Sequence, residues 1–159
     1  MNKLLRILLI ALLITLGVFF FINVNQSNNT NTNNNQPEIV ETTIAEDGKY
    51  TSKEDVALYI HTYNKLPSNY VNKNDAKKLG WVASKGNLTK VCEGCSIGGD
   101  VFGNREKILP SEEGRTYYEC DIDYVEGTRN AKRIVYSNDG LVYYTEDHYN
   151  TFELLYGEP

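Results

Sequence analysis

Residues 133–145 read RIVYSNDGLVYYT, and this stretch decides the fold of the chain. Two runs rich in β-branched and aromatic residues, 133–137 and 141–145, lie on either side of an Asn-Asp-Gly sequence at residues 138–140. Such runs favour β-strands, and the Asn-Asp-Gly sequence favours a tight turn between them. The stretch therefore predicts an antiparallel hairpin.

A further strand is predicted just before this hairpin. In residues 116–124, TYYECDIDY, the side chains alternate between the two faces of a strand. Glu119 and Asp121 share the outward face, opposite to the face that carries Cys120. If this strand lies next to the hairpin, the carboxylates and Arg133 meet on one sheet face, close to His148 just past the last strand.

Helices are predicted in the first half of the same domain. Ser52, with an aspartate three residues on, is typical of a helix start, and the apolar residues that follow have helical spacing up to Pro67. Asn72 caps a second short helix that stops at Gly80, and a third is expected around residues 87–91. Helices followed by strands predict an α+β domain, with short N-terminal helices packed on one antiparallel β-sheet.

The beginning of the chain differs from the predicted domain, which covers residues 50–159. Two basic residues precede the uncharged run ILLIALLITLGVFFFI at residues 7–22, so residues 1–24 are predicted to be an export signal. No small-x-small cleavage site follows, and a cleaved signal peptide and a retained signal anchor both stay open. Residues 25–49 are predicted to be an Asn-rich disordered tether. The expected location is extracellular, with membrane contact only through the N-terminal segment.

The chain carries a net negative charge. It holds 16 Lys and Arg against 21 Asp and Glu, a net charge of −5. Taken alone, this balance argues against a nucleic-acid partner, because proteins that neutralise phosphates usually have a basic surface. Any site for an anionic substrate must therefore depend on local positive potential.

Four residues near the predicted hairpin can combine into one chemistry. A carboxylate and a histidine on opposite sides of a reacting atom act as base and acid. Fixed cations beside them suit a phosphoryl group, whose negative charge grows in the transition state. Glu119, His148, Arg129 and Arg133 fit RNA cleavage by the neighbouring 2′-hydroxyl. From spacing alone, the alternative stays open that each is an ordinary surface or ion-paired residue.

From Val56 to Phe152 the sequence resembles the barnase-like ribonucleases, small secreted guanyl-preferring enzymes of bacteria, and aligns with them without a gap. The resemblance is carried by the stretches TYNKLPSNY, LGWVASKGNL, SIGGDVFGNRE, GRTYYE, RNAKRI and EDHYNTF. It implies the microbial ribonuclease fold and cleavage of single-stranded RNA 3′ of guanosine. The expected reaction is transesterification to a 2′,3′-cyclic phosphate, followed by hydrolysis. No cofactor and no metal are expected; RNA and a barstar-like inhibitor are the expected partners of a monomer.

The resemblance also assigns catalytic roles to individual residues. It implies that Glu119 takes the proton of the 2′-hydroxyl and that His148 protonates the leaving 5′-oxygen. Three cations would stabilise the pentacoordinate phosphate: Lys73, Arg129 and Arg133.

Substrate binding is assigned in the same way. The implied guanine site is the loop of Phe102, Gly103, Asn104, Arg105 and Glu106, where backbone N–H groups donate to guanine O6 and Glu106 accepts from the ring N–H and amino group. Tyr149 and Ser84 would complete the substrate site. Asp100 and Asp121 would support it, with Asp121 orienting the two arginines.

The three cysteines depart from the family, whose members usually have none. Cys92 and Cys95 lie in a CEGC sequence. In an exported protein two interpretations stay open: the two cysteines form a disulfide, or both are free thiols. A zinc site would need two more ligands, and the sequence offers none at suitable spacing. Cys120 alternates with core positions and is predicted to be a buried thiol.

Two other functions are compatible with the same sequence. One is a non-catalytic, membrane-tethered RNA-binding module, although a binder needs no acid-base pair. The other is the same nuclease domain used as a delivered toxin, which the sequence does not distinguish from a secreted enzyme.

Overall fold

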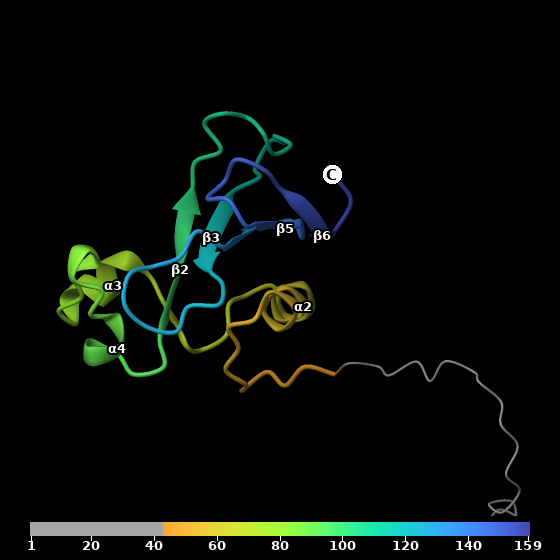
Figure 1. The fold of residues 1–159 in the computed structure, drawn as a ribbon. Helices are drawn as coiled ribbons and strands as arrows, with labels where there is room; N and C mark the ends of the chain where they lie inside the picture. The colour runs from red at the N-terminus through yellow and green to blue at the C-terminus, as the bar shows by residue number, and fades with distance from the viewer. Residues whose placement is uncertain (1–42) are drawn as a thin grey trace, which may run out of the picture. The chain divides into compact units, whose positions relative to one another are not determined.

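The computed structural model describes residues 43–159, so the predictions for residues 1–24 and for residues 25–42 of the tether lie outside the described residues. Helices and strands follow one another in the order shown in Figure 1. The elements are α2 (Lys53–Tyr63), β1 (Tyr70–Val71), α3 (Lys73–Lys78), the 3₁₀-helix η1 (Ala83–Lys85), α4 (Leu88–Val91), β2 (Ser96–Phe102), β3 (Tyr117–Asp121), β4 (Arg133–Ser137), β5 (Val142–Thr145) and β6 (Glu153–Tyr156).

One sheet organises the domain, and its strands lie in the order β1-β2-β3-β4-β5-β6. The pair β1-β2 is parallel, and every other neighbouring pair is antiparallel. α3 and α4 lie at the β2 end of the sheet, and α2 packs on its β4–β6 part (Figure 1). The predicted α+β class is confirmed, whereas β1, β2 and β6 were not predicted as strands.

The predicted hairpin is formed by β4 and β5. Val135 pairs with Tyr143 and Arg133 with Thr145 across the two strands. The backbone N–H of Ser137 donates to the carbonyl of Leu141 at 2.8 Å and closes the turn. Gly140 has a φ of 104°, a conformation that side chains with a Cβ rarely adopt, which explains the glycine at this position.

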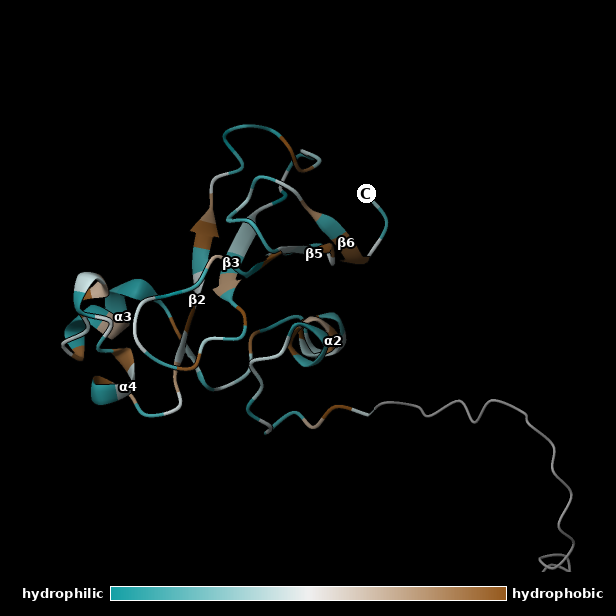
Figure 2. Cartoon of the chain, in the orientation of Figure 1, coloured by the Kyte–Doolittle hydropathy of each residue, from teal (hydrophilic) through white to brown (hydrophobic). Residues whose placement is uncertain are grey.

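Helix α2 begins as the sequence predicts. The Ser52 hydroxyl accepts a hydrogen bond from the Asp55 backbone N–H at 3.2 Å. The helix ends at Asn64, whose φ of 51° is left-handed, so it stops three residues before Pro67. In Figure 2, α2 carries both hydrophilic and hydrophobic residues, as expected for a helix with one covered face. That face packs on the sheet in a core of Val56, Ala57, Ile60, Cys120, Ile122, Ile134, Tyr136 and Val142.

Two smaller hydrophobic clusters complete the core. The first lies on the opposite sheet face and holds Leu109, Tyr117, Val135, Leu141 and Tyr143. The second joins α3 and α4 to the sheet and holds Ala76, Trp81, Leu88, Ile97 and Tyr124. Both faces of β3 are thus covered. Glu119 and Asp121 do lie opposite Cys120, but they are buried, and the prediction that they face outward to solvent is wrong.

The segment before α2 is attached to that helix by hydrogen bonds. The Tyr63 hydroxyl donates to the Ile44 carbonyl, and the Tyr59 hydroxyl donates to the Glu46 carbonyl, both at 2.7 Å. Lys65 forms an ion pair with Glu46 at 2.6 Å. Residues 43–49, predicted as part of the tether, therefore lie against α2. Within residues 43–159, no helix is long and apolar enough to cross a membrane.

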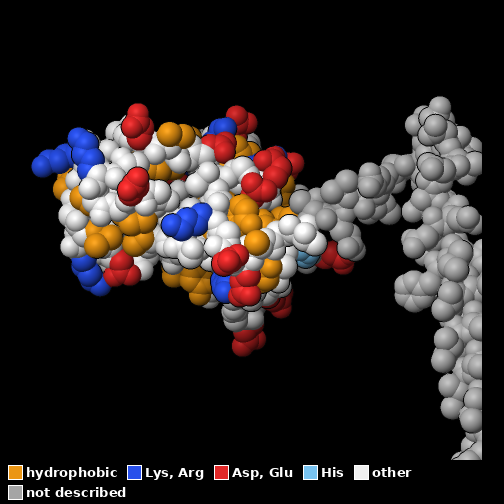
Figure 3. Space-filling model, turned by 90° about the horizontal axis from the view of Figure 1, so that it is seen from below, with side chains coloured by type: hydrophobic (Ala, Val, Ile, Leu, Met, Phe, Trp, Pro, Cys, Tyr) orange, Lys and Arg blue, Asp and Glu red, His pale blue; other side chains and the backbone are white. Residues whose placement is uncertain are grey.

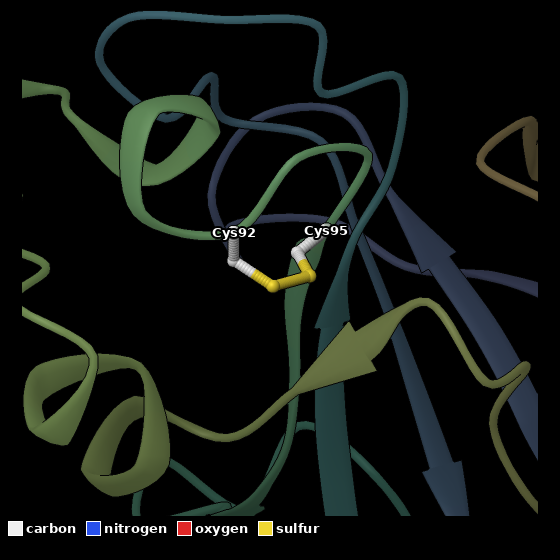
Figure 4. The surroundings of a disulfide bond; sticks show 2 residues. All are labelled: Cys92 and Cys95. Carbon is white, nitrogen blue, oxygen red and sulfur yellow. A yellow bond between two sulfur atoms is a disulfide. The ribbon is translucent and has the colours of Figure 1, made fainter.

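Cys92 and Cys95 form a disulfide that links the end of α4 to the start of β2 (Figure 4). Their Cα atoms lie 5.5 Å apart, within the range that disulfides span. Cys120 is a free thiol in the core under α2. Burial raises the pKa of the Cys120 thiol well above its ordinary value, so the reactive thiolate is scarce.

We expect thiol counting under denaturing, non-reducing conditions to give one free thiol per chain, that of Cys120. In the native protein the same thiol reagent should react slowly, because Cys120 is fully buried. A count of three after denaturation would show that Cys92 and Cys95 are reduced. The variant Cys120→Ala should then give none in the oxidised protein, which identifies the residue that reacts.

Candidate active site

A buried carboxylate stands between two arginines at one end of β3. The Arg129 side chain donates to both Asp121 carboxylate oxygens, at 2.6 and 2.5 Å. Arg133, which pairs with Asp121 across β3 and β4, places its Nε 3.0 Å from the same carboxylate. Burial alone would lower the pKa of Arg129, but its hydrogen bonds to Asp121 raise that pKa overall. Two guanidinium groups are therefore held around one buried anion.

Glu119 lies two residues earlier on the same strand face. Its side chain is 10% exposed and accepts hydrogen bonds from the Lys73 ammonium and from the Tyr149 hydroxyl. Burial alone would raise the pKa of Glu119, but these two hydrogen bonds outweigh it and hold the pKa below its ordinary value. Glu119 is therefore ionised at neutral pH, as a proton acceptor must be.

Lys73 reaches this carboxylate because of the local structure of α3. The Asn72 side chain accepts from the Asp75 backbone N–H at 2.9 Å and begins the helix directly before Lys73. The Lys73 backbone N–H donates to the Asp100 carboxylate on β2 at 3.0 Å. Asp100 lies opposite Glu119 in the β2-β3 ladder. The first turn of α3 is thus fixed to the sheet beside Glu119.

His148 is held in an irregular turn after β5. His148 and Tyr149 both have positive φ values, 57° and 75°, which are unusual for residues with side chains. The Asp147 carboxylate accepts hydrogen bonds from the backbone N–H groups of Asn150 and Thr151, and from the Thr151 hydroxyl. The turn leaves His148 exposed with its ring 4.6 Å from the Tyr149 ring. An exposed imidazole beside the Glu119 partner Tyr149 is available to a substrate.

The predicted guanine loop follows β2. Asn104 has a φ of 41°, a left-handed conformation that asparagine tolerates better than most residues with side chains. The Asn104 side-chain amide donates to the Leu109 carbonyl at 2.8 Å and accepts from the Leu109 backbone N–H at 3.1 Å. These two hydrogen bonds fix the conformation of the loop. The Phe102 ring lies 5.1 Å from the Tyr149 ring, so the loop adjoins the residues around Glu119. Arg105 and Glu106 are exposed.

The structure brings most of the predicted site residues together. Those linked by hydrogen bonds, ion pairs or ring contacts to the groups around Glu119 and Asp121 are Lys73, Asp100, Phe102, Arg129, Arg133, His148 and Tyr149. Within the described residues, no such contact is made by Ser84, Gly103, Asn104, Arg105 and Glu106. Ser84 lies in η1, next to Lys85.

Two supporting residues were not predicted. Asp147 closes the turn that presents His148, and the Asn130 carbonyl accepts from the Arg133 guanidinium at 2.7 Å. The Asp147 interaction has a sequence signal, an aspartate followed by a threonine four residues on, which is typical of a side-chain-stabilised turn. No sequence signal predicts the contact at Asn130, because this contact depends on the path that residues 122–132 take back to β4.

The α+β fold and the match to a ribonuclease family model together identify an RNA-cleaving enzyme. The chain belongs to the ribonuclease family, whose model matches residues 53–156. The resemblance to the barnase-like ribonucleases is therefore confirmed, and family membership implies RNA as the substrate.

Individual relatives agree with this assignment. Over 97 residues, 61% of this chain, it is 62% identical to a ribonuclease of Heyndrickxia coagulans, of which the match covers 89%. The same identity and length are found with a ribonuclease of Bacillus intermedius, of which the match covers 60%. A protein named guanyl-specific ribonuclease St, from Saccharopolyspora erythraea, is 44% identical over 57 residues, 35% of this chain and 56% of the relative.

Replacing Tyr149 by Phe should raise the pKa of Glu119, because one of the two hydrogen bonds that stabilise its ionised form is lost. A hydrogen bond to a charged group contributes about 1.5–3 kcal/mol, so the acid limb of the kcat/KM profile should move upward by roughly one to two pH units. Tyr143→Phe is the matched control, since Tyr143 lies in the cluster next to the site. Equal profiles for the two variants would contradict a role of Tyr149 in setting this pKa.

Replacing Asp147 by Asn should destabilise the turn around His148 in a pH-dependent way. Hydrogen bonds from the Thr151 backbone and hydroxyl lower the pKa of Asp147. A lowered pKa stabilises the fold above the unfolded-state pKa, and this stabilisation is lost as the pH falls through the folded-state pKa. The difference in unfolding free energy between Asp147→Asn and the wild type, from urea titrations, should therefore be present at neutral pH and shrink below about pH 4. A difference that is constant with pH would contradict the assignment.

Proposed function

We propose that the protein is an endoribonuclease that cleaves single-stranded RNA on the 3′ side of guanosine. The observation that carries the proposal is a buried, ionised Glu119 on the same strand face as Asp121, which holds two guanidinium groups. The positive charge of Arg129 also contributes to the lowered pKa of Glu119. This arrangement suits a reaction in which the Glu119 carboxylate receives a proton while a neighbouring phosphate gains charge.

In the proposed reaction, Glu119 takes the proton of the ribose 2′-hydroxyl. The 2′-oxygen then bonds to phosphorus, and the bond from phosphorus to the 5′-oxygen breaks. His148, which is exposed beside Tyr149, gives a proton to that 5′-oxygen. The product is a 2′,3′-cyclic phosphate, and in the slower hydrolysis that follows the two residues exchange roles.

The cations of the site have separate parts in this proposal. Arg129 and Arg133 are positioned by Asp121 and stabilise the charge that develops on the phosphate. Lys73 is already in contact with Glu119 and completes the positive rim on the side of α3. The site needs no bound ion for these steps, since the proton acceptor and the charged groups are all side chains.

Preference for guanine is assigned to the loop after β2. The loop is fixed by the Asn104 side chain, and its Glu106 is exposed and free to accept from the guanine N–H groups. A donor pair beside an acceptor distinguishes guanine from the other bases, because a wrong base would leave these groups unpaired. The relative from Saccharopolyspora erythraea, named guanyl-specific, supports this assignment.

We further propose that the protein acts outside the cell as a monomer that a barstar-like protein can inhibit. Support for export is the apolar run in residues 7–22, which lies outside the described residues. The inhibitor and the oligomeric state rest on the resemblance to the family.

The full chain, incubated with GpA and with ApA, should convert GpA faster and yield guanosine 2′,3′-cyclic phosphate. Glu119→Ala should reduce the kcat for GpA by roughly 10²–10⁴-fold, because it removes the general base. Circular dichroism should show that this variant remains folded, and Glu113→Ala, a change of an exposed glutamate, should leave kcat unaltered. Near-wild-type cleavage by Glu119→Ala would remove Glu119 from the mechanism. Equal rates on GpA and ApA would refute the guanine preference.

A further inference from the structure

The basic residues of the domain are unevenly distributed. We define the helical lobe as residues 72–95, which contain α3, η1 and α4 around the Trp81 cluster. The lobe holds five lysines against two acidic residues, a net charge of +3, whereas the rest of residues 43–159 holds nine basic against 17 acidic residues. In Figure 3 the blue side chains gather at the end of the molecule that carries α3 and α4, and red ones are more frequent toward α2.

Three of the five lysines of the helical lobe carry charge that no carboxylate of residues 43–159 pairs with. Within residues 43–159, Lys77, Lys85 and Lys90 are exposed and form no ion pair. Lys73 and Lys78 of the lobe are paired with carboxylates. Outside the lobe, Lys53, Lys65 and Lys132 are paired with carboxylates, and Lys49 and Lys107 are not. The positive charge of Lys77, Lys85 and Lys90 is therefore not neutralised by neighbouring side chains, and it is available to a polyanion.

The helical lobe is continuous with the active site. Lys73, the first residue of α3, contacts Glu119, and Lys77 lies four residues further on the same helix face. On its other side the lobe meets the loop that leads to Arg129. A Cβ on Gly86, which follows η1, would come within 2.5 Å of the Gly127 carbonyl carbon, so the two backbones are packed directly together. The disulfide of Cys92 and Cys95 further ties the end of α4 to the sheet.

We propose that the helical lobe binds the phosphates of single-stranded RNA beyond the scissile one, with Lys77 and Lys90 as the principal contacts. This inference rests on the proposed function, and it adds the surface on which a long substrate is held. It also accounts for RNA binding by an acidic domain. The positive charge is concentrated on one lobe beside the reacting phosphate, and the acidic charge lies on the remainder. A dinucleotide has no phosphate beyond the scissile one, so Lys77 and Lys90 should matter only for longer RNA.

The test compares two double variants with equal change in net charge. Lys77→Gln/Lys90→Gln removes two lobe cations, and Lys53→Gln/Lys65→Gln removes two from the α2 side. The binding probe is a 12-nucleotide RNA whose single guanosine is replaced by 2′-deoxyguanosine, so that it is not cleaved. For single strands the slope of log Kobs against log salt is about −0.7 per neutralised phosphate. The magnitude of the slope should therefore be smaller by roughly 1.4 for the lobe variant than for the wild type, and the control should keep the wild-type slope.

Three further measurements complete the test. Both double variants should turn over GpA at the wild-type kcat, while only the lobe variant should lose kcat/KM on the corresponding all-ribose 12-mer. Lys77→Arg/Lys90→Arg should restore the salt slope, which separates charge from folding. Binding to phosphatidylserine-containing vesicles tests a lipid surface as the alternative partner.

Equal salt slopes for the two glutamine variants would overturn the proposal, as would a slope that arginine does not restore. Loss of vesicle binding by the lobe variant with an unchanged RNA slope would assign the lobe to lipid instead and also overturn it. If the wild-type protein failed to cleave GpA, the proposed function would be wrong. The binding slopes on the uncleavable RNA would still decide the role of the lobe.

Discussion

The site depends above all on the buried carboxylate of Asp121 between Arg129 and Arg133. The carboxylate is 1% exposed, and removal of one partner from such a buried arrangement typically costs about 3–5 kcal/mol, because an uncompensated charge remains inside the protein. One anion with two guanidinium groups leaves a net positive charge. The interaction therefore fixes the segment of residues 122–132 to the start of β4, and it also concentrates positive potential where the proposed function places the phosphate.

Glu119, the proposed general base, and the turn around His148 show how the domain stabilises local states that are unfavourable by themselves. Burial disfavours an ionised Glu119, and the Lys73 ammonium and the Tyr149 hydroxyl compensate for it. The positive φ values of His148 and Tyr149 are unfavourable for residues with side chains, and the hydrogen bonds that Asp147 accepts hold that turn closed. Tyr149 belongs to both arrangements, so the conformation of the turn and the ionisation of Glu119 are physically coupled.

Sequence patterns predicted those parts of the fold that local chemistry determines. The hairpin around Gly140 and the caps at Ser52 and Asn72 follow from side-chain rules and were found as expected. Strand β2 was missed because its glycines, Gly98 and Gly99, have low strand propensity; a Cβ at Gly98 would come within 2.5 Å of the Cys120 Cβ, a long-range constraint. The burial of Glu119 was missed for a similar reason. Alternation along one strand gives the face of a side chain, but only tertiary structure decides whether that face is covered.

Net charge was the least informative sequence quantity for function, and the structure gives the reason. Charges on exposed surfaces are screened over about 8 Å at physiological ionic strength, so a substrate phosphate responds mainly to the groups next to it. Around Glu119 these groups are Lys73, Arg129 and Arg133, held by hydrogen bonds in a partly dry site where screening is weak. The acidic excess lies outside the helical lobe and this cation group. An acidic protein can therefore present a cationic site, because placement of charge, and not its sum, sets the potential that RNA meets.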